Sequence, residues 1–487
     1  MAGLWENRTA EYVLDSLRDA RTNERMQYEQ ECANHLAFYA GGSDLASKLV
    51  RHSTESVADF ERRRQRFVSM NYTTPMGDQI INGLYGPPVE RHIENDDAGQ
   101  KVFEAIWKVN NIHRKMIDGA TNTVITGDNY VRSYWDIDLK TVRYAVLDSR
   151  NILPIPKGDD AEQLEALMED RSELLFTADG RLQTIRRGYI FTKDLFTEFM
   201  SSADGKSSWF VVRDKAGDVK PVDVMQPNPY KTIPYAHWKG RSLPGQYSGL
   251  SLIRDAVTIQ AEINNRTSAL TVLVTMQGFA TLVIKGRTGG TLTLKEHGYI
   301  EIDEDGDALY LQPNAPIDEV QGSIEFLIKG LFETGAVPIS AIRGGTASSG
   351  LQLAMELKPL SDIVGRLKTQ AIESERDLFN ITRIIHNTYG TPKISERAEF
   401  IPDFPETFLP QDKIAEMMND LTLVNNTPPL MSREQFWKKH NPDLSDDQIK
   451  KLAQEIDMSF AESRRIRGSL LPPRAGFVAA VPTGEEE

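Results

Sequence analysis

One run of apolar residues constrains this chain more than any other feature. From about Leu351 to Asn387, apolar side chains recur in steps of three, four and seven, the spacing of one face of an α-helix. An unbroken helix of that extent is about 55 Å long, far above the mean helix length of ~11–12 residues. Pro359 and Gly365 predict a kink near its start. A helix this long usually crosses a whole assembly, so the fold must be organised around it.

Two shorter helices are predicted before the long one, over 251–277 and 317–333. The second is sharply two-faced, because its apolar residues gather on one side and its charged residues on the other. These charged residues are Asp318, Glu325, Lys329 and Glu333. Residues 280–316 carry two hairpin signals, at 286–290 and 303–307, and predict a small β insertion between the two helices. A glycine- and serine-rich loop over 338–350 separates the second helix from the long one.

The N-terminal half predicts helices over 9–40, 51–69 and about 98–123, with a turn-rich break at 72–86. The second of these carries Arg62, Arg63, Arg64 and Arg66. We interpret this basic run as a helix face exposed to water.

From 127 to 238 the pattern changes to alternation punctuated by turns, which predicts antiparallel hairpins with strands over 130–135, 182–191 and 209–213. After the long helix we expect a strand over 398–401 and further helices over 411–425, 432–440 and 445–466. A tail predicted to be disordered follows from 469. The fold class is therefore α+β.

Composition excludes several classes of function. The 487 residues carry a net charge of −14, which disfavours a protein that grips nucleic acid by neutralising phosphates. The single cysteine, Cys32, excludes an internal disulfide and a cysteine-ligated zinc site, and suits a reducing cytoplasm. The polar N-terminus predicts no signal peptide, and no apolar stretch is long enough to span a membrane.

Catalytic signatures are also missing. Residues 205–207 resemble the end of a phosphate-binding loop, but Met200 stands where its first glycine belongs. The eight histidines contain no His-x-x-x-His pair, and the acidic turn at 303–307 has its glycine, Gly306, at the wrong position for a calcium loop. We therefore expect no metal, no cofactor and no enzyme, although an active site without a local signature stays open.

The order of these parts, together with several short motifs, resembles the portal protein of tailed bacteriophages. The resemblance covers roughly residues 9–466. The motifs that carry it are Thr126–Val131, Ile233–Trp238, Gly249–Ile253, Val337–Gly344 and Leu430–Glu434.

The resemblance implies that the chain is a portal-like subunit of a twelve-fold ring around a channel for double-stranded DNA at one capsid vertex. The implied divisions are a wing (1–250, β-rich over 127–238), stem helices (251–278 and 317–337), a clip (279–316), a tunnel loop (338–350), the long helix with a wing strand (351–402), crown helices (403–468) and a disordered tail (469–487). The implied partners are DNA bound without sequence specificity, the terminase large subunit, the head–tail adaptor, and the major capsid and scaffold proteins. The implied location is the virion, after assembly in the host cytoplasm.

The resemblance also implies roles for individual residues. The tunnel loop would contain Arg343, Gly344, Gly345, Thr346, Ser348, Ser349 and Gly350. The stem would present Asp318, Glu325, Lys329 and Glu333 to the channel, where mostly acidic side chains let a polyanion slide. The clip would dock the motor and the adaptor through Arg287, Lys295, Glu301, Asp303, Glu304 and Asp305.

Three alternatives stay open at this point. One is another virion ring or adaptor protein, which the chain length disfavours. Another is a soluble multidomain enzyme with an unrecognised site, for which titratable groups should converge in a cleft. The third is a motor or nuclease of DNA packaging, which the missing nucleotide loop and metal ligands disfavour.

Overall fold

The computed structural model divides the chain into two compact units, Met1–Phe408 and Leu409–Glu487. It describes residues 5, 8–19, 23–176, 181–202, 208–213, 219–278, 281–285, 307–311, 317–338, 350–405, 420 and 433–440. In the second unit the described helix is α12 (Arg433–His440), within the range predicted for it, and Lys439 Nζ lies 2.8 Å from the carboxylate of Asp420. The helices predicted over 411–425 and 445–466 and the tail lie outside the described residues.

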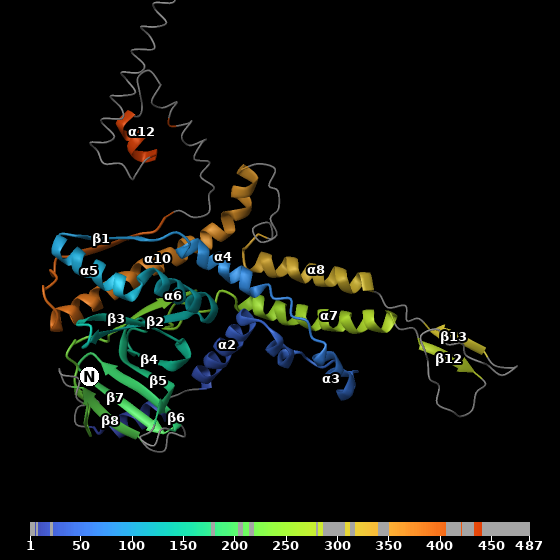
Figure 1. Cartoon of the computed structure of the whole chain (residues 1–487), viewed down its shortest axis with the longest axis horizontal. Helices are drawn as coiled ribbons and strands as arrows, with labels where there is room; N and C mark the ends of the chain where they lie inside the picture. Colours follow the sequence, from blue (N-terminus) through green and yellow to red (C-terminus); the bar gives the residue numbers. More distant parts are fainter. Residues whose placement is uncertain are drawn as a thin grey trace, which may run out of the picture. The chain divides into compact units, whose positions relative to one another are not determined.

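Helices and turns of 3₁₀-helix dominate the N-terminal part of the first unit (Figure 1). They are α1 (Ala10–Asp19), α2 (Asn23–Ala40), η1 (Ser43–Lys48), α3 (Val57–Gln65), α4 (Thr73–Tyr85), α5 (Asp97–Asn110) and α6 (Ile112–Thr126). The prediction of one helix over 9–40 was wrong, because α1 packs in a different hydrophobic cluster from α2. The prediction of one helix over 98–123 was also wrong: Asn111 adopts a left-handed conformation with φ 49° and separates α5 from α6.

The helix α4 occupies the stretch that we predicted to be a turn-rich break. Pro75, Gly77 and Gly83 lower its intrinsic helix propensity. Met76, Ile80, Ile81, Leu84 and Tyr85 are nonetheless all buried on it. Burial of these side chains outweighs the poor propensity, which explains why the sequence pattern failed here.

Antiparallel strands fill most of the region from 128 to 239, as predicted. They are β2 (Asp128–Asp136), β3 (Thr141–Leu147), β4 (Ile152–Pro156), β5 (Leu164–Phe176), β6 (Leu182–Thr192), β7 (Leu195–Ser202), β8 (Ser208–Arg213), β9 (Val219–Pro221), β10 (Gln226–Pro227) and β11 (Tyr235–Lys239), with η2 (Ser149–Asn151) before β4. One sheet has the order β4-β5-β6-β7-β8-β9, with β10 paired to β7, and a smaller sheet has the order β11-β2-β3. Consecutive strands pair as hairpins in β2–β3 and from β4 to β9, so the antiparallel hairpins predicted for this region are confirmed.

The second half contains the long helices. α7 (Arg254–Gly278), α8 (Ile317–Thr334) and α10 (Gly350–Tyr389) closely match the three predicted helices, and α10 carries Pro359 inside it. Figure 1 shows α10 changing direction near its N-terminal end, as the proline predicts. β12 (Thr281–Lys285) pairs antiparallel with β13 (Asp307–Leu311), so the first strand of the predicted insertion meets its last. β14 (Glu399–Asp403) fits the predicted strand and pairs with β1 (Glu90–Glu94).

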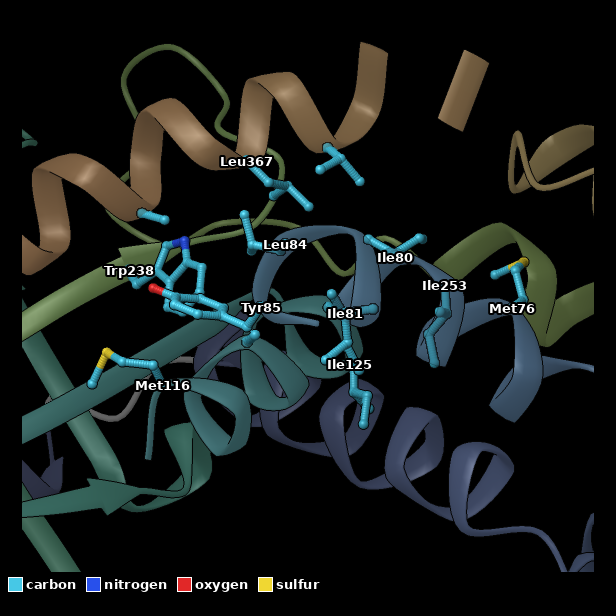
Figure 2. Close-up of a cluster of buried hydrophobic side chains, with 14 of the residues drawn as sticks. Met76, Ile80, Ile81, Leu84, Tyr85, Met116, Ile125, Trp238, Ile253 and Leu367 are labelled. Atoms are coloured by element: carbon cyan, nitrogen blue, oxygen red, sulfur yellow. The ribbon is translucent and has the colours of Figure 1, made fainter. Parts of the chain in front are cut away.

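A single large hydrophobic cluster joins these helices to the smaller sheet. It includes residues from α4, α6, α7, α8, α10 and β11. Figure 2 shows its centre, where Tyr85 lies beside Trp238 and Leu84 faces Leu367 of the long helix. The rings of Tyr85 and Trp238 meet edge to face with centroids 5.6 Å apart. The core therefore fixes α7 and α8 to α10, and this positions the surfaces described next.

Candidate channel surface on the α7–α8 pair

The helix α8 has one buried side and one exposed side, and it packs along α7 (Figure 1). Ile324, Ile328, Leu331 and Phe332 are buried on the first side. Asp318, Glu325, Lys329 and Glu333 are all exposed on the second, which confirms the two-faced pattern seen in the sequence.

The charges on this exposed side are only weakly tied to one another. Lys329 Nζ lies 3.7 Å from Glu333 Oε1, and the two side chains are 70% and 68% exposed. Such an exposed i,i+4 pair contributes about 0.3–0.5 kcal/mol at most. These side chains are therefore available to meet another molecule.

A polar face of α7 holds the segment that precedes α4. The amide nitrogen of Gln260 donates to the carbonyl of Met70 at 2.6 Å, and its oxygen accepts from Tyr72 N at 2.9 Å. Further along α7, Asn265 Oδ1 accepts from Val50 N at 3.0 Å. These bonds satisfy buried polar groups, so they fix the segment against the helix.

Arg63 is a buried residue of this face that the sequence interpretation missed. Its side chain is 2% exposed, donates to Ser268 Oγ on α7 at 2.9 Å and forms an ion pair with Glu55 at 2.9 Å. The prediction of an exposed basic run was therefore wrong for Arg63. The spacing of Phe60, Arg63 and Phe67, in steps of three and four, places this arginine on the apolar side of α3 and could have revealed it.

The long helix carries a buried carboxylate among its apolar residues. Glu375 accepts two hydrogen bonds from the guanidinium of Arg91, both 2.8 Å long, and a third from the hydroxyl of Tyr85 at 2.8 Å. Burial and the adjacent carboxylate raise the pKa of Tyr85 well above its usual value, so the phenol stays protonated as a donor. This network ties α10 to α4 and to β1.

Three of the sequence motifs quoted above meet at another buried carboxylate. Asp128 accepts from the hydroxyl of Tyr28 at 2.7 Å and from Gly249 N at 2.9 Å, and its Oδ1 lies 2.7 Å from His237 Nε2. Gly127 just before it has φ 94°, and a Cβ there would lie 2.6 Å from the carbonyl oxygen of Gly249. The close approach of the two segments therefore requires glycine at 127.

A cavity of about 560 Å³ opens beside this carboxylate. Its lining includes Lys239, Tyr247, Glu373 and Asp377, and His237 also reaches it. Burial, and then the neighbouring Glu373, raise the pKa of Asp377. The His237 ring is clamped between Tyr130 and Tyr247, with centroids 4.5 Å from each, and it engages Asp128. These contacts indicate that His237 has a structural role, which is to join the three sequence motifs.

Among the described residues, no three or more His, Cys, Asp or Glu side chains are grouped so as to hold a metal ion. None of the helices in the described part of the chain combines the length and the apolar character needed to cross a membrane.

The other predicted site residues fall elsewhere. Gly350 is the first residue of α10. The remaining tunnel-loop residues, Arg343, Gly344, Gly345, Thr346, Ser348 and Ser349, lie outside the described residues, as do the clip residues Arg287, Lys295, Glu301, Asp303, Glu304 and Asp305.

The long helix, the paired α7 and α8 and the antiparallel sheets are the parts expected of a protein of the portal class. The chain belongs to the family described as phage portal protein, SPP1 Gp6-like, whose sequence pattern matches residues 16–461. It is therefore a structural protein of the portal type. No curated protein matches it.

Several solved structures are similar at low identity. One is a chain from the neck of an empty GTA particle (12% identity, covering 78% of this chain and 92% of that one, TM-score 0.43). Another comes from the virion of a native gene transfer agent particle (12% identity, covering 82% and 97%, TM-score 0.43). A third comes from the neck of the native GTA particle computed with C12 symmetry (13% identity, covering 74% and 88%, TM-score 0.39).

Proposed function

We propose that this chain forms a ring of twelve copies at one vertex of a phage capsid, and that double-stranded DNA enters and leaves through the central channel. Membership of the portal family over residues 16–461 is the observation that carries this proposal. The ring docks the terminase large subunit during filling and the head–tail adaptor afterwards. It assembles with the major capsid and scaffold proteins in the host cytoplasm and has no enzymatic role of its own.

The exposed side of α8 supports a channel role physically. Asp318 and Glu325 repel phosphates, and Lys329 offers a single compensating contact. Each phosphate contact adds to salt-dependent affinity, so a surface with few cations holds DNA weakly. A channel lined in this way lets the duplex slide in both directions.

The first test is electron microscopy of the purified protein combined with native mass spectrometry of the same sample. We expect annular particles with a central hole and a mass of twelve subunits. If the isolated chain is monomeric, the same measurement is made after assembly with capsid and scaffold proteins. Failure to form rings under both conditions would overturn the proposal and favour the enzyme alternative.

The tunnel-loop assignment has a separate test. Arg343→Glu should leave ring formation intact and lower the amount of DNA packaged, because it adds negative charge at the narrowest part of the proposed channel. The matched control is Arg397→Glu, which makes the same change at an exposed position between α10 and β14. Equal packaging by both variants would contradict the assignment.

A further inference from the structure

One aromatic side chain on α8 is largely exposed. Phe326 is 74% exposed, on a helix that buries Ile324, Ile328, Leu331 and Phe332. Gly322 and Gly330 lie four residues before and after it, and both have open space around them. Phe326 therefore stands alone between two positions without side chains, where another chain can approach closely.

Most of the charges around Phe326 are acidic, and Lys329, three residues after it, is the one basic residue of the helix. Glu319 and Glu333 are each seven residues from it, which places them within about 20° of its direction around the helix axis. Both are exposed. α8 as a whole carries four acidic residues and one basic residue. The surface around Phe326 is thus apolar at its centre and negative at its margin.

The segment 48–70 has the opposite charge and its own exposed apolar residues. It contains six basic and three acidic residues, in a chain whose net charge is −14. Arg62 and Arg64 are exposed in surface ion pairs with Asp59 and Glu61, and Arg66 is exposed as well. Exposed apolar side chains accompany them, namely Val50, Val57, Val68 and Met70. This segment complements the surface around Phe326 in both charge and apolar character.

The two surfaces lie on opposite sides of one helix. α8 and α3 both pack on α7, and Figure 1 shows α8 on one side of α7 and α3 on the other. The α3 side is fixed by the bonds from Arg63 to Ser268 and from Val50 to Asn265 described above. In a closed ring with rotational symmetry, each copy offers one surface to one neighbour and a different surface to the other. Complementary surfaces on opposite sides of α7 meet that requirement.

We propose that the surface of α8 around Phe326 docks on residues 48–70 of the next copy of this chain. This inference rests on the proposed ring and assigns the contact between its subunits. Phe326 is the apolar anchor, and the valines of the segment cover it. Glu319 and Glu333 face the exposed arginines of α3. This places Glu333 at the contact between copies and not at the channel, where the resemblance put it, while Asp318, Glu325 and Lys329 remain on the neighbouring stripe that faces the channel.

Charge reversal tests the pairing of the two surfaces. Glu319→Arg with Glu333→Arg makes both surfaces basic, and Arg62→Glu with Arg64→Glu makes both acidic. Each double variant alone should lower the fraction of protein in rings by at least about tenfold, because like charges then meet at every contact. An equal mixture of the two variants should restore rings in which they alternate, six copies of each. Native mass spectrometry reads both outcomes.

Controls separate this contact from general effects of charge or apolar surface. Glu396→Arg with Glu399→Arg makes the same change in charge at exposed positions near β14 and should leave rings intact. Phe326→Ser should reduce ring formation, whereas Leu139→Ser, at an exposed turn between β2 and β3, should not. Circular dichroism confirms that each variant is folded.

A cross-link tests the proximity directly. In Phe326→Cys combined with Val57→Cys, a short bismaleimide should join neighbouring subunits into a ladder that ends at the full ring. The native Cys32 should not react with the cross-linker, because it is buried and burial raises the pKa of its thiol to about 12. Each single-cysteine variant alone should give no ladder.

The outcomes distinguish this inference from the proposed function. Rings that form normally in both reversed variants, without rescue by mixing and without a cross-linked ladder, would overturn the docking assignment and leave the portal proposal standing. A wild-type chain that forms no rings, even with capsid and scaffold proteins, would overturn both.

Discussion

The ion pair between the long helix and β1 is buried, whereas the ion pair on α8 is exposed to solvent. The Arg91–Glu375 pair has side chains 6% and 4% exposed and a separation of 2.8 Å. The Lys329–Glu333 pair has side chains 70% and 68% exposed and a separation of 3.7 Å. Together with Tyr85, the first pair joins α10, β1 and α4. The second pair joins two residues of the same helix. The buried pair thus stabilises the packing of the body, whereas the pair on α8 lies open to solvent.

The largest expected effect comes from breaking the buried pair. Glu375→Ala leaves Arg91 and the hydroxyl of Tyr85 without their acceptor in the core, so we expect a loss of about 3–5 kcal/mol in the free energy of unfolding. Urea denaturation followed by circular dichroism measures it. Glu375→Gln, which keeps part of the hydrogen bonding, should lose less. A loss below about 1 kcal/mol in the alanine variant would show that the body does not depend on this charge.

An intermediate effect should appear as a dependence of stability on pH. Burial lowers the pKa of His386 below its usual 6.5, so the unfolded chain binds a proton at a higher pH than the folded chain does. Protonation of His386 in the unfolded chain therefore lowers the free energy of unfolding progressively as pH falls below about 6.5. His386→Gln removes this titration and should flatten the fall in urea midpoint between pH 7 and 5.5. An unchanged slope would assign the effect to other groups, of which His35 is the first candidate because burial lowers its pKa too.

The smallest effect should come from the exposed pair. Lys329→Ala removes one exposed ion pair from a helix face, and we expect a change of less than about 0.5 kcal/mol in the free energy of unfolding. The same urea measurement applies. A loss larger than about 1 kcal/mol would mean that the exposed side of α8 supports its own subunit, and the contrast between the two regions would fail.

The sequence predicted the elements whose signal is local and missed those that depend on distant partners. The helical spacing of Leu360, Val364 and Leu367 was sufficient to predict α10, because a long apolar stripe at this spacing indicates an α-helix. The pairing of β1 with β14 joins residues about 300 positions apart, and no local pattern shows it. The helix α4 was missed because its stability comes from burial among other elements.

The candidate site shows the same division. The two faces of α8 could be predicted from its spacing alone, and the structure confirms the exposure of the four charged residues that the sequence analysis named. The burial of Arg63 could be found only by comparing it with Phe60 and Phe67, since the neighbouring arginines give the same local signal. The exposure of Phe326 could not be predicted, because it lies on a helix that buries several of its other apolar residues.

The carboxylate of Asp128 also has a structural consequence. Gly249, which donates to it, stands five residues before the start of α7, and Tyr28 and His237 donate or bind to it from α2 and β11. One buried carboxylate thus joins the loop that leads into α7 to α2 and to β11. A change at Asp128 would therefore disturb the start of α7 and the sheet of β11, β2 and β3 together.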